Sequence, residues 1–413
     1  MGLYPARALE RTMKVQEVIL RAISGKILWM QAAEILGISD RSLRRWKQRY
    51  EEHGYDGLFD RRRQRPSPKR VPLETVEKVL RLYRERYFDF NVKHFAEKVQ
   101  EEHGIKLSYS WIKTALQMAG LVARRRRRGK HRQRRPRRPL AGVLLHVDGS
   151  THAWLGEGRG KQDLIVVFDD ATSRMYYAQL VEQESRLTVM QALKTVVEKQ
   201  GVFCSLYVDR GSHFATTPTV GGLADRQQPT QIGRALEQLG IELILAYSPQ
   251  ARGRCERLFG TWQGRLVQEL RVRRLTTRLA ANRFLHQYWI GSHNRKFTVA
   301  ASQEGTAFMA YRGSDLNKIF SLQEERVVGN DNTVRYDNLV LQIASQTFRY
   351  SLARCRVLVC RHLDASLSLY YGQHLLGCYD GKGNLLARPK PSPEKGERDR
   401  LRKTCSASQG APC

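Results

Sequence analysis

The chain has 413 residues, with 71 Lys and Arg against 40 Asp and Glu, which gives a formal net charge of +31. Its length allows several domains, and the clustered basic excess predicts a polyanionic partner rather than only a solvated basic surface. No apolar run has membrane-spanning length, the N-terminus has no apolar signal core, and an odd number of cysteines, 7, excludes a complete disulfide framework. We therefore expect free thiols and a bacterial-type cytoplasmic, nucleoid-associated protein with no membrane partner.

The N-terminal segment carries a helix-turn-helix pattern. Apolar residues from Val15 to Ala22 follow helical spacing, a short helix over residues 30–36 ends at Gly37, and Ser39 can cap a third helix over residues 41–50. In the third helix, Leu43 and Trp46 would pack inward and leave a polar face for a DNA groove. The predicted groove-facing residues are Arg41, Ser42, Arg44, Arg45 and Lys47. An ordinary helical hairpin is the alternative.

Three further helical stretches follow, ETVEKVLRLYRER, VKHFAEKVQEEHG and SYSWIKTALQMAG. Ser108 or Ser110 would cap the last of them. This arrangement repeats the three-helix layout and predicts a second DNA-binding module.

An arginine-rich run, RRRRRGKHRQRRPRR, comes next and holds eleven basic residues and no acid. Such a run repels itself unless a polyanion neutralises it, so it is a candidate for contacts with the DNA backbone; a solubilising linker is the alternative. Its basic residues are Arg124, Arg125, Arg126, Arg127, Arg128, Lys130, Arg132, Arg134, Arg135, Arg137 and Arg138.

The central part predicts a mixed α/β sheet with helices on its faces. The stretches GVLLHV, DLIVVFDD and RMYYAQLV are expected to form an antiparallel meander. A helix over residues 185–199, the strand FCSLYV, a helix over residues 230–239 and the strand IELILA follow. A long helix over residues 254–271 and another over residues 279–289 complete this part.

Short strands rich in β-branched and aromatic residues fill the C-terminal part and predict a small β-barrel. The tail is polar, rich in Pro and Lys, and is expected to be disordered. The sequence therefore predicts a multidomain protein. Its expected parts are a helix-turn-helix domain (1–65), a second helical DNA-binding module (66–123), an arginine-rich linker (124–140), an α/β core (141–300), a linker (301–323), a small β-barrel (324–388) and a disordered tail (389–413).

Three acidic residues are the candidates for chemistry. Asp148 in LLHVDGS and Asp209 in LYVDRGSHF each follow an apolar run, and Glu256 opens the predicted long helix. Two carboxylates at strand ends and one on a helix can hold a pair of Mg²⁺ ions, which supports phosphodiester cleavage and joining. A lone Asp after a strand is more often a turn former, and Asp169 with Asp170 form a competing pair.

Basic residues surround Glu256 in the segment SPQARGRCER. The guanidinium groups of Arg252, Arg254 and Arg257 suit a substrate phosphate and would help to keep Glu256 ionised. They complete the predicted site.

The motifs HVDGSTHAWLGEGRG, LIVVFDDATSR, YVDRGSHF and GIELILAYSPQARGRCERLFGTWQ resemble the DDE transposases of the retroviral-integrase superfamily, most closely the ISNCY-type insertion-sequence transposases. The resemblance extends from about residue 12 to residue 388. It implies an RNase H-like core in which Asp148, Asp209 and Glu256 are both the catalytic residues and the metal ligands. It also implies two Mg²⁺ ions as cofactors, for which Mn²⁺ is an expected substitute.

The resulting hypothesis is a DNA transposase that cleaves transposon ends and joins them to target DNA. Its expected partners are double-stranded DNA, as transposon ends and as target, and further copies of itself, because both ends must be cut together. Two alternatives stay open. One is a DNA-binding regulator with an inactive core, and the other is a metal-dependent nuclease without joining activity.

Overall fold

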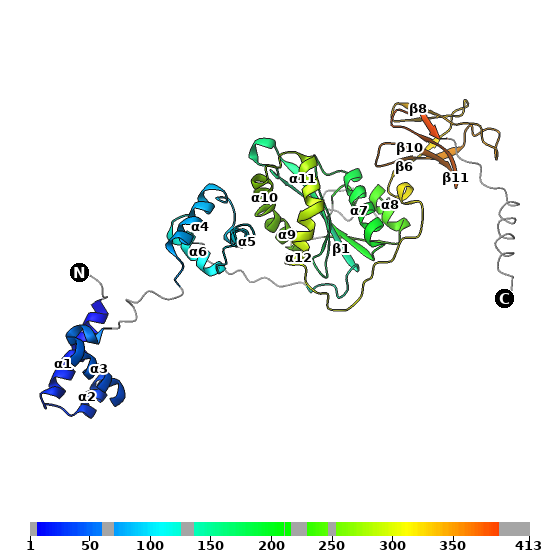
Figure 1. Cartoon of the computed structure of the whole chain (residues 1–413). Helices are drawn as coiled ribbons and strands as arrows, with labels where there is room; N and C mark the ends of the chain where they lie inside the picture. Colours follow the sequence, from blue (N-terminus) through cyan, green and yellow to red (C-terminus); the bar gives the residue numbers. More distant parts are fainter. Residues whose placement is uncertain are drawn as a thin grey trace, which may run out of the picture. The chain divides into compact units, whose positions relative to one another are not determined.

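A computed structural model describes residues 6–59, 70–124, 136–209, 211–215, 229–246 and 253–387. The chain divides into two compact units, Met1–Arg81 and Leu82–Cys413 (Figure 1). The predicted disordered tail lies outside the described residues.

The first unit contains the expected helix-turn-helix. Helices α1 (Ala6–Ile23), α2 (Trp29–Leu36) and α3 (Asp40–His53) are followed by a 3-10 turn, η1 (Gly54–Leu58). Gly37 ends α2 at φ 63°, a left-handed conformation that suits glycine, and the Ser39 hydroxyl accepts the Ser42 backbone N–H at the start of α3. Ile19, Ala32 and Leu43 are buried between the helices and fix the fold of this unit.

Three more helices precede the sheet: α4 (Leu73–Glu85), α5 (Val92–His103) and α6 (Tyr109–Met118). Asn91 caps α5 and Ser108 caps α6, each by accepting a backbone N–H with its side-chain oxygen. These helices occupy the stretches that were predicted to be helical.

The core sheet has the strand order β3-β2-β1-β4-β5. Strands β1 (Leu144–His152), β2 (Gln162–Asp169) and β3 (Met175–Val181) form the predicted antiparallel meander. Strands β4 (Ser205–Val208) and β5 (Glu242–Leu245) continue the sheet in parallel with β1. All eight residues of β2 are buried, because helices cover both faces of the sheet.

Helices flank the core sheet (Figure 1). Alternate residues of the strands face opposite helical layers, as the pleat of a strand requires. Leu145, Val147 and Val167 pack with α7 (Arg186–Gln200) and α8 (Gln231–Gln238). On the other face, Val166 and Phe168 pack with the helices that follow β5. Each fully buried side chain of this size contributes roughly 1.5–3 kcal/mol.

The prediction of one long helix over residues 254–271 is wrong, because two helices occupy this segment. Helix α9 (Gly253–Gln263) and helix α10 (Leu266–Val272) are separated at Gly264 and Arg265, where Arg265 has φ −139°. The Gly264 carbonyl, released from helical hydrogen bonding, accepts the side-chain N–H of Asn91 at 2.7 Å. A tertiary contact therefore accompanies the break.

The predicted helix over residues 279–289 is part of a longer helical segment. It consists of α11 (Arg278–Phe284), a π-helical turn, η5 (Leu285–Trp289), and α12 (Ile290–Phe297). Trp289 meets Trp262 of α9 edge to face, with ring centroids 5.8 Å apart.

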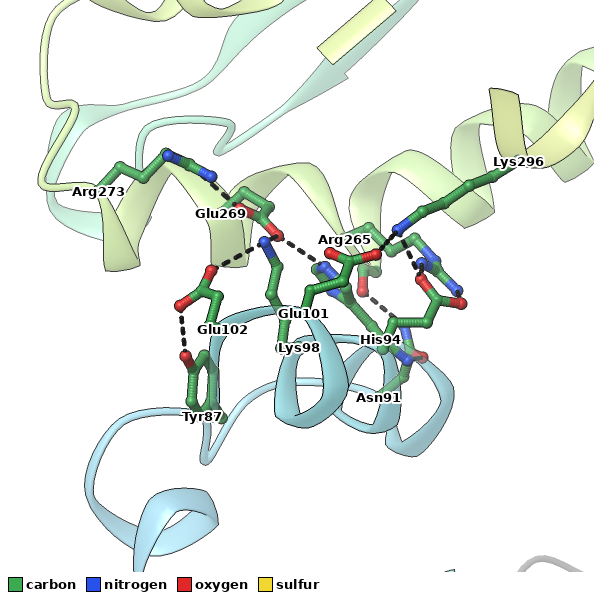
Figure 2. A network of polar contacts seen from close by, with 12 residues as sticks. Tyr87, Asn91, His94, Lys98, Glu101, Glu102, Arg265, Glu269, Arg273 and Lys296 are labelled. Carbon is green, nitrogen blue, oxygen red and sulfur yellow. Dashed lines mark hydrogen bonds and ion pairs between the residues drawn. The ribbon is translucent and has the colours of Figure 1, made fainter. Parts of the chain in front are cut away.

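Helix α5 is docked on α10 and α12 through a largely buried polar network (Figure 2). The Glu269 carboxylate pairs with His94 at 2.8 Å and with Lys98 at 2.7 Å, and all three side chains are almost fully buried. Arg265 pairs with Glu97 at 2.7 Å beside this network. This face of the expected second DNA-binding module is therefore occupied by the core.

The C-terminal part is β-rich, as predicted, but its strands form open sheets among the described residues. After α13 (Leu316–Ile319), one sheet has the order β12-β11-β10-β9-β6 and a separate hairpin joins β7 and β8. The strands are β6 (Leu322–Val327), β7 (Thr333–Tyr336), β8 (Leu339–Gln342), β9 (Arg356–Arg361), β10 (Leu367–Tyr371), β11 (His374–Tyr379) and β12 (Leu385–Ala387). Closure into a barrel is not confirmed.

The cysteines of the described residues are free thiols, as expected. No helix of the described ranges is both long and apolar enough to span a membrane.

Candidate active site

The strand register brings Asp148 and Asp209 to the same edge of the sheet. Leu144 pairs with Ser205 and His146 with Tyr207 in the parallel β1–β4 ladder. Continuing this register by two residues places Asp148 beside Asp209. Both residues are half-buried at the point where the ladder ends. This edge is the usual location of ligands in α/β sheets.

A tight turn after β4 orients Asp209. Its Oδ1 accepts the Gly211 backbone N–H at 2.9 Å. A Cβ atom at position 211 would lie only 3.0 Å from the same oxygen, so glycine lets the backbone of residue 211 approach the Asp209 carboxylate closely. On β1, a Cβ atom at Gly149 would meet the Glu184 carboxylate, so that side chain would have to move to admit any other residue.

Glu256 lies in the first turn of α9, on the face of β1 that carries His146 and Asp148. Cys255, its neighbour, is buried, and its Sγ lies 3.9 Å from His146 Nδ1. Glu256 itself is exposed. Within the described ranges, no three carboxylate, histidine or cysteine groups form a ready-made metal cluster. The carboxylate oxygens nevertheless match the ligands that Mg²⁺ prefers.

Asp170, just after β2, is a buried hub between β1 and α9. Its Oδ1 accepts His146 Nε2 at 2.8 Å and also a guanidinium N–H of Arg254. Its Oδ2 accepts the Arg138 backbone N–H at 2.8 Å. Burial alone would raise the pKa of Asp170, but hydrogen bonds from His146, Arg138 and Arg254 hold the pKa well below its usual range.

The histidine in this hub was not predicted as a site residue. His146 is fully buried within the apolar run that opens β1, stacks on Phe168 and meets Tyr207 edge to face. A single polar residue two positions before Asp148, on the same face of the strand, was the available signal in the sequence.

Asp169 has a different role from its neighbour. Its Oδ1 accepts the Gly142 backbone N–H at 3.0 Å, and its Oδ2 accepts the backbone N–H and the hydroxyl of Thr172 at 2.7 Å each. It therefore organises the turn between β2 and β3, as an Asp in a turn does.

The basic residues predicted around Glu256 differ in their placement. Arg254 is held by Asp170 and by the Pro136 carbonyl, which accepts its guanidinium N–H at 3.0 Å. Arg257 is exposed. Arg252 lies outside the described residues.

The predicted groove-facing residues of α3 also divide into two groups. Arg41, Arg44 and Arg45 are exposed. Ser42 shares a 3.0 Å hydroxyl contact with Ser39 at the helix cap. Lys47 lies 4.8 Å above the Trp29 ring and pairs with Glu51, so it faces its own unit.

Only the ends of the arginine-rich run are described. Arg124 is exposed. Arg137 is bound by the core, because its guanidinium donates to the Asp170 and Ala171 carbonyls and to the Ser173 hydroxyl. Arg138 contributes its backbone N–H to Asp170. The residues outside the described ranges are Arg125, Arg126, Arg127, Arg128, Lys130, Arg132, Arg134 and Arg135.

Asp209 follows the end of β4 as predicted, but Asp148 lies inside β1, which continues to His152 because residues 148–152 still pair with β2. Helix-turn-helix elements and an α/β core with two aspartates where the β1–β4 ladder ends define a DNA-binding protein with an additional functional domain. Family models agree with the first part of this description. A helix-turn-helix domain matches residues 16–67, and a homeodomain-like domain matches residues 42–116. The predicted helix-turn-helix is thereby confirmed.

Two relatives cover most of the chain. The putative transposase y4bF of Sinorhizobium fredii (strain NBRC 101917 / NGR234) is 30% identical over 371 residues, covering 89% of this chain and 80% of the relative. The transposase for insertion sequence IS1202 of Streptococcus pneumoniae is 27% identical over 392 residues, covering 85% and 83%. The chain belongs to this family of insertion-sequence transposases.

Solved structures give weaker matches. The simian T-cell lymphotropic virus intasome in complex with the PP2A regulatory subunit B56 gamma aligns with a TM-score of 0.34 at 11% identity, over 76% of this chain and 100% of that chain. The HTLV-2 integrase catalytic core domain in complex with magnesium, in its dimeric form, aligns with a TM-score of 0.27 at 16% identity, over 36% and 89%. At these TM-scores the alignments carry no argument about the site.

Proposed function

We propose that this protein is a DDE transposase that cleaves the ends of its mobile element and joins them to target DNA. The observation that carries the proposal is the β1–β4 register, which aligns Asp148 with Asp209 at one sheet edge, in a member of a transposase family. Glu256 approaches from α9, on the face of β1 that carries Asp148. The three carboxylates are the proposed catalytic residues.

Asp148, Asp209 and Glu256 would hold two Mg²⁺ ions, with Mn²⁺ as a substitute, because carboxylate oxygens suit both. When bound, such an ion pair activates the attacking oxygen and stabilises the leaving oxygen of an in-line displacement. The sheet edge fixes the two aspartates, and the Gly211 N–H orients the second of them. Glu256 is exposed in the first turn of α9, and its side chain would turn toward them when the ions bind.

DNA would be bound by separate elements. The exposed Arg41, Arg44 and Arg45 of α3 are the proposed base-reading residues, since the recognition helix of a helix-turn-helix enters the major groove. The arginine-rich run and Arg257 would neutralise phosphates. We further infer a homo-oligomer on DNA, because two ends must be cleaved and joined together.

The first test removes one carboxylate charge at a time. Asp148→Asn, Asp209→Asn and Glu256→Gln are each expected to lower cleavage of a transposon-end duplex at least about 100-fold, because each change removes a negative ligand from the metal site. Binding to the same duplex should stay at the wild-type level in gel-shift assays. Glu242→Gln is the matched control, because Glu242 is an exposed carboxylate at the opposite end of the sheet.

Wild-type cleavage by any one of the three variants would remove that residue from the proposed site. Two results with the unmutated protein would favour the alternative functions, a regulator or a nuclease. A chain that binds ends and never cleaves them would be a regulator. A chain that cleaves ends and fails to join a pre-cleaved end to target DNA would be a nuclease.

A further inference from the structure

The hub around Asp170 connects the strand of one proposed catalytic carboxylate to the helix of another. His146, which donates to Asp170, lies two residues before Asp148 and on the same face of β1. Arg254, which also donates to Asp170, lies two residues before Glu256 in the first turn of α9. One buried carboxylate therefore bridges both elements.

The contacts of Asp170 require a carboxylate. Three donors converge on its two oxygens: the His146 ring, the Arg254 guanidinium and the Arg138 backbone N–H. An asparagine has only one acceptor oxygen, so its amide N–H₂ would face one of these donors. It would also leave the Arg254 side chain, which is only 17% exposed, without its charged partner at this position.

The first turn of α9 depends on this pairing for its position. The segment that leads into α9, residues 247–252, lies outside the described residues, and α9 begins at Gly253. Polar contacts that tie this turn to the rest of the core include those of Arg254 with Asp170 and with the Pro136 carbonyl, and the contact of Cys255 with His146.

We propose that Asp170 is a positioning residue which, through Arg254 and His146, fixes the first turn of α9 against β1 and thereby sets Glu256 relative to Asp148. The inference rests on the proposed function, because it assigns Asp170 a role in arranging the same carboxylates. Asp170 does not itself touch the metal ions or the DNA. Groups that orient metal ligands in this way typically change metal affinity or activity roughly 10- to 100-fold when they are replaced.

The experiment compares Asp170→Asn with Asp169→Asn in the full chain. Asp169 is the matched control, because it is equally buried and lies next in the chain, but its carboxylate accepts hydrogen bonds from Gly142, which precedes β1, and from Thr172 of the β2–β3 turn. For each variant, cleavage of a transposon-end duplex is measured across a Mg²⁺ titration. Hydrogen exchange of the backbone amides of residues 253–258 is followed without metal or DNA.

Asp170→Asn is expected to raise the Mg²⁺ concentration for half-maximal cleavage at least about tenfold and to leave end binding unchanged. Hydrogen exchange in the first turn of α9 should become faster. Asp169→Asn should show neither effect, although both variants are expected to lower the thermal unfolding midpoint. Arg254→Met should reproduce the Asp170→Asn results, and the double variant should be no worse than the more impaired single variant, because both act through one contact.

The inference would be overturned if Asp170→Asn and Asp169→Asn needed the same Mg²⁺ concentration for cleavage and showed the same hydrogen-exchange rates in α9. Failure of the proposed function has a different signature. In that case Asp148→Asn or Glu256→Gln would still cleave DNA, while the exchange of residues 253–258 in Asp170→Asn would still report whether the hub positions α9.

Discussion

His293 is a buried histidine whose surroundings favour the neutral ring. Its Nδ1 accepts the Trp262 indole N–H at 3.0 Å, and only 4% of the residue is exposed. Burial, reinforced by the nearby Arg265 charge, lowers the pKa of His293 from 6.5 to about 4. Protonation therefore favours the unfolded chain, so this stabilising contribution is intact above pH 6.5 and is lost as the pH falls toward 4.

From this shift we predict that acidification to pH 5 costs the second unit about 2 kcal/mol of unfolding free energy through His293 alone. His293→Gln should weaken the dependence of the unfolding midpoint on pH between 7.5 and 5. It should not remove that dependence, because burial also lowers the pKa of His94. The exposed His374 supplies the control, and His374→Gln should keep the wild-type pH dependence. Equal pH dependence in wild type and His293→Gln would contradict the assignment.

At the scale of elements, the docking of α5 on α10 depends on buried charges (Figure 2). Burial opposes ionisation of Glu269, but hydrogen bonds from His94 and Lys98 lower the pKa of Glu269 to about 2. The same partnership raises the pKa of Lys98 although burial would lower it. Both groups are thus charged across the ordinary pH range and depend on each other.

Breaking this pair should be costly. Glu269→Gln is expected to lower the unfolding free energy by roughly 3–5 kcal/mol, because the Lys98 charge stays buried without its main partner. Urea unfolding of the full chain measures the loss of unfolding free energy. Hydrogen exchange of residues 92–103 shows whether that loss is located in α5. The exposed pair of Arg278 and Glu182 provides the comparison, and Glu182→Gln should cost less than about 1 kcal/mol. Equal effects of the two changes would show that α5 is not held by Glu269.

On the scale of the whole molecule, the net charge of +31 predicts strongly salt-dependent DNA binding. Neutralising Arg125, Arg126, Arg127 and Arg128 together should weaken binding to all DNA about equally. The slope of log affinity against log salt should fall by roughly 0.9 for each phosphate contact that is lost. Discrimination between transposon ends and random DNA should change little, since phosphate contacts carry no sequence information directly.

Titrating both DNAs at several salt concentrations would measure these quantities. Replacement of the four exposed residues Arg335, Arg349, Arg354 and Arg356 of the C-terminal part makes a control for the loss of basic charge alone. An unchanged slope would show that the run is a linker. Selective loss of binding to transposon ends would instead show that it reads a narrow minor groove.

Local signals in the sequence determined most of the elements and the candidate residues. The caps at Ser39 and Ser108, the apolar runs of β1 and β2, and the acidic residues after apolar runs act over a few neighbouring positions, so they can be recognised without a fold. The helix-turn-helix and the family membership followed from such patterns, and both are confirmed. The assignment of Asp148, Asp209 and Glu256 stays a prediction.

Only the tertiary structure decided which polar groups meet. His94 and Glu269 are 175 positions apart, and Arg254 and Asp170 are 84 apart, so nothing local connects them. The break in the helix at Gly264 is likewise accompanied by a contact with Asn91 of another element, and closure of the C-terminal strands depends on long-range pairing. Buried charges need partners, and the fold, rather than the neighbouring sequence, supplies them.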